Sequence, residues 1–300
     1  MPEVIAPPSV RALARQKGID IEKLAKDIGR TSIAREDVEG GGSAGSPSAG
    51  AVPSASTETS YWDVDHAQYG PVSAEPMSRF AQVAAQNMAA AQTLIPAVTH
   101  HDSADVSAVE AFRKELKEEA QARGVRLTPL GFHVKALART LREFPKFNAS
   151  LSADGKMLFL KDYVHIGIAV DTAHGLMVPV IRDADRKGLW QIARDIADIA
   201  SRAQERKVRP EEMGGASMTI SSLGGIGGEA FTPIVNPPEV AILGITRTAI
   251  VPEWDGETFR PVPKVPLDLS YDHRVINGAD AARFLGYYAG LIAEPRRMVI

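Results

Sequence analysis

Near the end of the chain a single histidine, His273, separates a predicted strand from a predicted helix. Apolar and polar residues alternate up to Tyr271, and Asn277 with Gly278 leads into a helical pattern over residues 279–291. An imidazole titrates close to neutrality, so it can take up a proton and return it at physiological pH. His273 is therefore a candidate general base toward a thiol or hydroxyl. The alternative is a structural histidine in a turn.

A second candidate is Ser221, at the start of a glycine-rich stretch that runs to Gly228 after a strand-like segment. The stretch lacks the lysine of a phosphate-binding loop and the spacing of a dinucleotide fingerprint. A hydroxyl at a strand end, beside glycines that let a substrate approach, can donate a hydrogen bond to an oxyanion. A glycine turn with a capping serine is the alternative. Neither Ser221 nor Ser222 lies in a nucleophile elbow, which disfavours covalent serine catalysis.

The neighbours of His273 are predicted to shape its loop. On a strand, Asp272 and Arg274 would point away from the imidazole, so we expect them to pair with each other. Asn277 is expected to hydrogen-bond across the loop, since its amide lacks the charge of the carboxylate that orients many catalytic histidines.

Composition excludes several other functions. With no cysteine, the chain has no disulfide, thiolate nucleophile or cysteine-ligated metal. His100 and His101 would point to opposite faces of a strand, and His174 is expected in a solvated turn, so no metal site is predicted. A formal net charge of -3 argues against nucleic acid as the main partner. No apolar run reaches the roughly 20 residues of a membrane span, no signal peptide is recognisable, and the cytoplasm is the expected location.

The domain plan follows from changes in composition. Residues 4–39 are predicted to form a small helical domain with Val10 and Leu24 in its core, and residues 40–60 a flexible Gly/Ser/Ala/Pro linker. Residues 61–300 are predicted to form the larger domain. In the small domain Arg11, Arg15, Lys17 and Arg30 either form a basic face for an acidic partner or are simply solvated.

In the larger domain helices and strands mix without regular βαβ repetition. Helices are predicted at residues 76–95, 106–122, 129–143 and 190–204, before the last one at 279–291. Strands are predicted at residues 97–102, 157–160, 164–170, 176–180, 217–221, 240–245 and 265–271. The run at 240–245 is apolar enough to be a central strand. The pattern predicts an α/β two-layer sandwich with a mixed sheet.

Several of these stretches resemble one family. Asp272-His273-Arg274-Val275-Ile276-Asn277-Gly278 resembles the D-H-R-x-x-D/N-G signature of the dihydrolipoamide acyltransferases, the core components of 2-oxo acid dehydrogenase complexes. Residues 175–180 and 231–244 match further family blocks in the same order. The resemblance covers about residues 73–300 and implies a fold like that of chloramphenicol acetyltransferases. Residues 4–39 are similar to the family's small all-α peripheral subunit-binding domain.

The resemblance implies acyl transfer between dihydrolipoamide and coenzyme A, both as substrates. His273 would be the base, Ser221 the oxyanion donor and Asn277 the third residue of the site. No residues are assigned to coenzyme A binding, and no metal is implied. The stretches 221–228 and 231–236 are most similar to acetyl-transferring members, as in pyruvate dehydrogenase. No lipoyl domain is visible, so the lipoyl group is expected on a domain absent from this chain.

The family also implies an assembly. Its active site lies between the subunits of a homotrimer, with the histidine and the serine from different chains, and trimers build a cubic or icosahedral core. Residues 298–300 resemble the tail that joins neighbouring trimers. Residues 4–39 would dock the 2-oxo acid decarboxylase or the dihydrolipoamide dehydrogenase. The stretch 26–32 departs from the family's glycine-rich loop, with Ser32 in place of an arginine, so docking would use another contact such as Arg30.

Two other functions compete with this interpretation. The chain could be a scaffold that tethers partner enzymes with little activity of its own, which the missing lipoyl domain favours. It could instead be a free-standing acetyltransferase acting on a small hydroxyl acceptor, which the tethered N-terminal domain disfavours.

Overall fold

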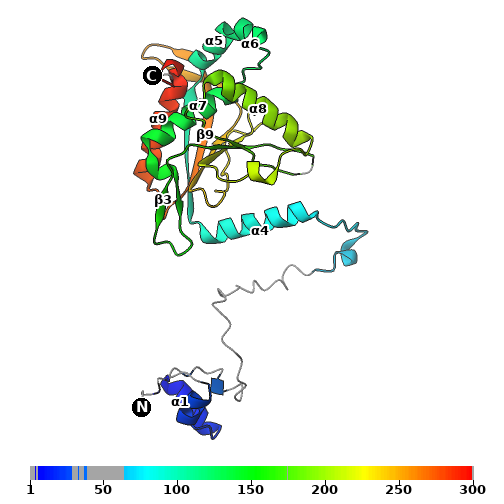
Figure 1. Cartoon of the computed structure of the whole chain (residues 1–300), viewed down its shortest axis with the longest axis vertical. Coiled ribbons are helices and arrows are strands. Elements are labelled where there is room, and N and C mark those ends of the chain that lie inside the picture. Colours follow the sequence, from blue (N-terminus) through cyan, green and yellow to red (C-terminus); the bar gives the residue numbers. More distant parts are fainter. Residues whose placement is uncertain are drawn as a thin grey trace. The chain divides into compact units, whose positions relative to one another are not determined.

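The computed structural model describes residues 4, 6–28, 33, 37–38, 64–173 and 175–298. The predicted linker at 40–60, His174, Arg30, Ser32 and residues 299–300 lie outside this set. The chain divides into two units, Met1–Ala74 and Glu75–Ile300 (Figure 1). Within the described residues no helix is both long enough and apolar enough to cross a membrane.

The N-terminal unit contains two short helices, α1 (Pro8–Gln16) and α2 (Ile21–Asp27). Asp20 caps α2 by accepting hydrogen bonds from the backbone of Glu22 and Lys23. The predicted apolar faces are buried together, through Val10, Ala14, Leu24, Ala25, Ile33 and Val38.

Arg11, one cation of the predicted basic face, forms hydrogen bonds within the N-terminal unit. Its guanidinium donates to the carbonyl oxygens of Val4 at 2.7 Å and Ala6 at 3.2 Å. The exposed cations Arg15 and Lys17 are the remaining described members of that face.

A mixed sheet runs through the larger unit in the order β1-β9-β7-β6-β4-β5, and β8 pairs with the outer part of β9. β4, β6 and β7 are parallel to one another, whereas the other pairs are antiparallel. The strands are β1 (Ala97–Asp105), β4 (Ile166–Ala169), β5 (Val180–Ile181), β6 (Met218–Ser222), β7 (Ala241–Ile245), β8 (Ala249–Trp254) and β9 (Phe259–Asp272). A separate hairpin joins β2 (Ala149–Leu151) and β3 (Leu158–Leu160).

Helices cover one face of this sheet, where α7, α8 and α9 lie against the strands (Figure 1). The helices of this unit are α4 (Arg79–Leu94), α5 (Ser107–Glu115), α6 (Lys117–Ala122), α7 (Pro129–Glu143), α8 (Leu189–Gln204) and α9 (Gly278–Ala293). Its short 3-10 turns are η3 (Pro145–Phe147), η4 (Pro210–Glu212) and η5 (Pro295–Met298), whereas η2 (His66–Tyr69) belongs to the N-terminal unit.

The two faces of the sheet differ in chemistry. On β9, Leu267, Leu269 and Tyr271 are buried in the core beneath the helices. Asp268 and Ser270 alternate with them and point to the opposite face, yet each is only 1% exposed. The sheet therefore has an apolar face toward the helices and a buried polar face on its other side.

Two predicted elements differ from the structure, and some strands were not predicted. The predicted helix at 106–122 is two helices, because Leu116 leaves the helical conformation with a ψ of 2° and packs on the core. The predicted strand at 176–180 is reduced to a bridge between Val170 and Met177, followed by β5. The β8–β9 hairpin was not predicted, since Pro261 and Pro263 disfavour a strand. They are tolerated because this part of β9 pairs with β8 alone; its pairing with β1 begins at Lys264.

A buried polar pair joins α7 to α9 within the core. His133 Nδ1 and Tyr288 Oη share a hydrogen bond of 2.6 Å, and burial lowers the pKa of His133 to about 4. Because this folded-state pKa is depressed, the unfolded chain binds the proton more strongly. The associated stability is complete above pH 6.5 and is lost as the pH falls toward 4.

This pair predicts acid lability. Between pH 7 and pH 4 the wild-type chain should lose about 3 kcal/mol more unfolding free energy than a His133→Asn variant. The asparagine amide can occupy the place of Nδ1 without titrating. Urea unfolding at the two pH values measures the difference, and equal losses in both proteins would contradict the assignment.

Candidate active site

His273 follows β9 directly and is held by the backbone. Its N–H donates to the carbonyl oxygen of Pro96 at 3.1 Å, while its side chain is exposed. The imidazole lies over the buried ring of Tyr271, with 5.8 Å between the ring centroids. The histidine is thus fixed at its backbone and open to solvent at its ring, which suits proton transfer to a bound substrate.

The loop after His273 is locked by an ion pair and a helix cap. Arg274 donates from Nη2 and Nε to the carboxylate of Asp272 at 2.7 and 3.0 Å, which confirms the predicted pair. Asn277 Oδ1 accepts the N–H of Asp280 at 2.8 Å and caps α9. Because the cap uses only the oxygen, the amide nitrogen of Asn277 is left for another partner.

Ser221 lies near the end of β6, on the polar face of the sheet. It aligns with Ala169 of β4 on one side and Gly244 of β7 on the other. Strand alternation turns Ser222 toward the opposite face. Of the two serines, Ser221 is the one that shares a face with the buried polar residues of β9.

Gly244 makes room for an aromatic ring beside Ser221. A Cβ atom at Gly244 would lie 2.7 Å from Cε1 of Phe231 and 3.0 Å from Cβ of Asp268. The Phe231 ring therefore lies over Gly244 of β7, the register partner of Ser221. Its backbone N–H donates to Oδ2 of Asp268 at 3.3 Å, which fixes this wall of the site.

Asp268 and His101 form a pair that sequence reasoning missed. The Nδ1 of His101 donates to Oδ1 of Asp268 at 2.6 Å, and the carboxylate is almost fully buried. The two residues are register partners on β1 and β9, on the polar face. The only sequence signal was the placement of an aspartate within an apolar alternating run.

His273 and Ser221 of one chain are far apart. Ser221 aligns through Gly244 with Asp268, which precedes His273 by five residues on β9. The separation is about 16 Å along the strands and about 10 Å across them. The two side chains of one chain therefore cannot contact the same reacting group.

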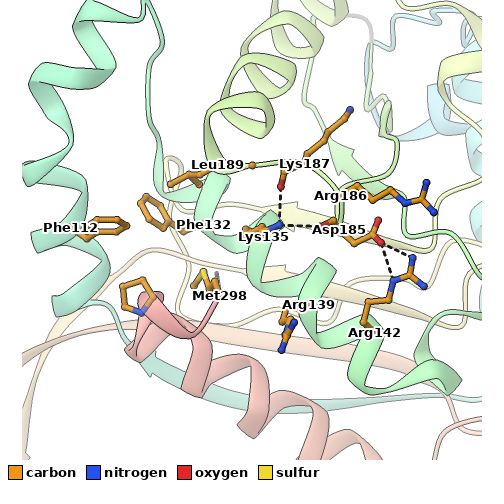
Figure 2. A pocket seen from close by; sticks show the side chains of 12 residues that line it. Phe112, Phe132, Lys135, Arg139, Arg142, Asp185, Arg186, Lys187, Leu189 and Met298 are labelled. Atoms are coloured by element: carbon orange, nitrogen blue, oxygen red, sulfur yellow. Dashed lines mark hydrogen bonds and ion pairs between the residues drawn. The ribbon is translucent and has the colours of Figure 1, made fainter. Parts of the chain in front are cut away.

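A cavity of about 440 Å³ lies on the polar face between the end of α4, β1 and residues 232–235. Thr99 and Ser270, which share a hydrogen bond of 2.7 Å, line it together with His101. A second cavity, of about 490 Å³, lies among α5, α7 and η5 and is rich in Lys and Arg side chains (Figure 2). It contains none of the predicted site residues. Among the described residues no cluster of three or more His, Asp or Glu could hold a metal ion.

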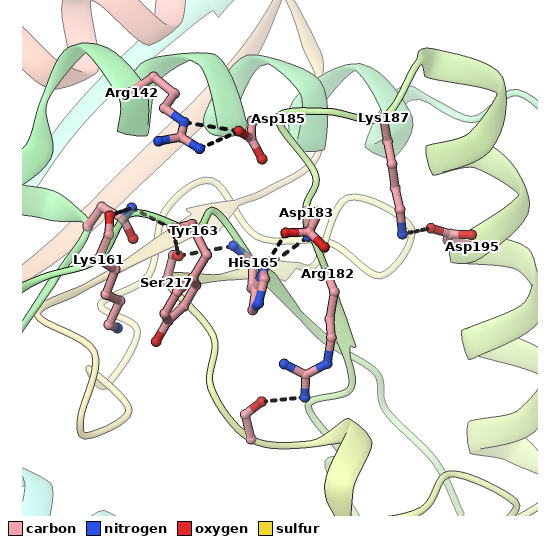
Figure 3. A network of polar contacts seen from close by, with 12 residues as sticks. Arg142, Lys161, Tyr163, His165, Arg182, Asp183, Asp185, Lys187, Asp195 and Ser217 are labelled. Atoms are coloured by element: carbon pink, nitrogen blue, oxygen red, sulfur yellow. Dashed lines mark hydrogen bonds and ion pairs between the residues drawn. The ribbon is translucent and has the colours of Figure 1, made fainter.

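A polar network supports the start of β6 (Figure 3). The backbone of His165 and Ser217 is joined by a 2.7 Å hydrogen bond, and Ser217 Oγ accepts the N–H of His165 at 3.0 Å. Nδ1 of His165 accepts the N–H of Asp183, so it carries no proton there, and burial lowers the pKa of His165. These contacts tie β4 and the loop after β5 to the strand that carries Ser221.

Comparisons with known proteins identify the family of this chain. The family model described as 2-oxoacid dehydrogenases acyltransferase (catalytic domain) matches residues 69–300. The chain is 44% identical to the dihydrolipoyllysine-residue acetyltransferase component of the pyruvate dehydrogenase complex of Pseudomonas aeruginosa, over 99% of this chain and 55% of that protein. It is 45% identical to the Azotobacter vinelandii component, over 99% of this chain and 48% of that protein. The chain therefore spans about half the length of these curated relatives.

Solved structures show the same relationship. The cubic core of the pyruvate dehydrogenase multienzyme complex matches with a TM-score of 0.78 at 50% identity, covering 79% of this chain and 98% of that chain. The Azotobacter vinelandii dihydrolipoamide acetyltransferase matches with a TM-score of 0.78 at 49% identity, with the same coverage. These matches confirm the predicted fold class and the predicted resemblance. The chain belongs to the 2-oxoacid dehydrogenase acyltransferase family, through its catalytic domain.

Proposed function

We propose that this chain transfers an acetyl group between dihydrolipoamide and coenzyme A, as the core acyltransferase of a pyruvate dehydrogenase complex. The observation that carries the proposal is the backbone-fixed, solvent-open His273 at the end of β9. A study of the Azotobacter vinelandii enzyme concerns a serine, a histidine and an asparagine in its catalytic mechanism. Those three residues are separated along that chain by the same two intervals as Ser221, His273 and Asn277 here.

The proposed chemistry needs one base and one oxyanion donor. His273 removes the thiol proton of coenzyme A, and the thiolate attacks the thioester carbonyl of S-acetyl-dihydrolipoamide. The hydroxyl of Ser221 donates to the oxygen that becomes negative. When the tetrahedral intermediate collapses, the imidazolium of His273 returns the proton to the departing dihydrolipoamide sulfur. Asn277, whose amide nitrogen is not used by the helix cap, is the third proposed residue of the site.

We infer that two chains complete each site. The separation of His273 and Ser221 within one chain supports a site in which one subunit supplies the base and its neighbour supplies the donor. A cyclic trimer gives three equivalent sites of this kind. The match to a cubic core supports assembly of such trimers into a larger particle.

Acetyl transfer from acetyl-coenzyme A to free dihydrolipoamide tests the function directly. The purified chain should catalyse it with saturation by both substrates. A chain that forms large particles but transfers no acetyl group would instead be a scaffold. A chain that acetylates chloramphenicol or a similar hydroxyl acceptor in preference to dihydrolipoamide would be a free-standing acetyltransferase.

The tail gives a prediction about assembly. The intact chain should elute at megadalton mass. Removal of residues 298–300 should reduce it to trimers of about 96 kDa, since each shortened chain is slightly lighter than the 32.2 kDa of the intact chain. Met298 is buried against the core, so removal of residues 299–300 alone is the variant that spares it. Light scattering measures both masses, and large particles persisting in both variants would refute the role of the tail.

We also propose that residues 4–39 dock the 2-oxo acid decarboxylase or the dihydrolipoamide dehydrogenase. Since the guanidinium of Arg11 donates to the carbonyl oxygens of Val4 and Ala6, Arg15 and Lys17 are the described members of the predicted basic face that stay open to an acidic partner. We further propose that the acetyl group is carried on a lipoyl group. We also propose that the protein is located in the cytoplasm.

A further inference from the structure

Glu239 is a buried carboxyl that the proposed chemistry does not use. It ends a tight turn in which its N–H donates to the carbonyl oxygen of Asn236 at 3.0 Å, and it is only 5% exposed. Oε1 accepts hydrogen bonds from Thr219 Oγ1 at 2.8 Å and Asn236 Nδ2 at 3.3 Å. Oε2 is buried and has no hydrogen-bond partner among the described residues. A group in this state needs an explanation, because an unpartnered buried oxygen is costly.

One set of contacts connects Glu239 to the strand that carries Ser221. Thr219, which donates to Glu239, precedes Ser221 by two residues on β6 and points to the same polar face. The hydroxyl of Thr219 packs tightly on β4: a Cβ atom at Gly167 would lie 2.5 Å from its Oγ1. The position of this part of β6 is therefore determined by its bond to Glu239 on one side and its contact with Gly167 on the other.

A second set of contacts connects the turn at Glu239 to the loop of His273. The residue after Glu239, Val240, accepts the N–H of Asp272 at its carbonyl oxygen at 2.8 Å. Asp272 directly precedes His273 and forms the ion pair that locks its loop. A shift of the turn that ends at Glu239 would thus move the anchor of the proposed base.

We propose that Glu239 is a positioning residue for acyl transfer, whose buried carboxyl holds the turn from which the strand of Ser221 and the loop of His273 are both aligned. The inference rests on the proposed function. In the assembled trimer each chain would supply His273 to one active site and Ser221 to another. A single turn that aligns both therefore affects every site.

The ionisation of Glu239 makes its positioning role testable by varying the pH. Burial raises the pKa of Glu239 to about 7, against smaller opposing effects of the Thr219 and Asn236 hydrogen bonds and the charge of Lys161. The ammonium of Lys161 donates to the carbonyl oxygen of Ala216 at 2.9 Å. With this pKa the carboxyl is mostly protonated at pH 6, and ionisation above pH 7 leaves a buried charge with an unpartnered oxygen. Because this folded-state pKa is raised, stability falls as the pH rises from 4.5 through about 7.

The test compares Glu239→Gln with wild type, because glutamine keeps the shape and the acceptor oxygen but cannot ionise. At pH 6 its kcat for acetyl transfer should lie within about twofold of wild type. At pH 8.5 its kcat should exceed that of wild type about tenfold, and its melting temperature should no longer fall between the two pH values. Glu257→Gln, the same change at an exposed position of the β8–β9 hairpin, should follow wild type throughout.

A second variant keeps the test decisive. Glu239→Ala removes the acceptor, and kcat at pH 6 should fall about 100-fold, with KM changed less than about threefold, if its melting curve remains cooperative. Identical pH profiles for wild type and Glu239→Gln would overturn the inference, as would unchanged kcat in Glu239→Ala. Failure of the proposed function looks different, because wild type itself would then transfer no acetyl group.

Discussion

Replacing His273 with alanine should lower kcat for acetyl transfer about 1000-fold, within the range expected for loss of a general base. The thiol of coenzyme A is mostly protonated at neutral pH, so its nucleophilic form depends on a base at the site. The effect should fall on kcat and kcat/KM together, because the proton moves in the transition state. Transfer kinetics with saturating dihydrolipoamide measure it.

The variant should fold normally, because the side chain of His273 is exposed and its anchor is a backbone hydrogen bond. His66→Ala, which removes an exposed histidine of η2, is the matched control and should keep wild-type rates. Turnover within about threefold of wild type in His273→Ala would remove the histidine from the mechanism.

Replacing Ser221 with alanine should lower kcat by about 100- to 1000-fold, the loss typical of one oxyanion donor. The hydroxyl acts on charge that develops during the reaction, so KM should change little. Ser222→Ala is the natural comparison and should stay within about threefold of wild type, because Ser222 points away from the polar face. A larger loss in Ser222→Ala than in Ser221→Ala would show that the wrong hydroxyl was chosen.

Mixing the two inactive variants tests whether a site needs two chains. Trimers assembled from His273→Ala and Ser221→Ala chains contain some interfaces with an intact histidine from one chain and an intact serine from the next. Random mixing should restore activity at about a quarter of the sites. If each site lay within one chain, mixing would restore no activity. The separation of Ser221 and His273 inferred from the strand register would then be wrong.

The sequence was most informative where chemistry and local structure coincide. His273 and its neighbours could be identified because a strand pattern, a turn and a helix start occur within a few residues. The pairing of Asp272 with Arg274 was also predicted, and it forms in the turn after β9, where Asp272 also accepts the backbone N–H of Arg274. Their ion pair is present in the structure.

Prediction failed where distant segments meet. The β8–β9 hairpin was missed because Pro261 and Pro263 are tolerated only where β9 has one neighbour, and pairing partners are not visible in a linear pattern. The His101–Asp268 pair and the hydrogen bond between Thr219 and Glu239 were missed because each joins residues from different segments of the chain.

By itself the sequence determined which side chains could do chemistry, the α/β mixed-sheet class and the family to which the chain belongs. Only the tertiary structure decided that Ser221 rather than Ser222 shares the polar face, and that Ser221 and His273 of one chain cannot meet. The reason is register: strand pairing sets which distant residues are neighbours, and a shift of one residue would reverse every face. The position of His273 is thus local information, whereas the face to which each serine points is a property of the folded sheet.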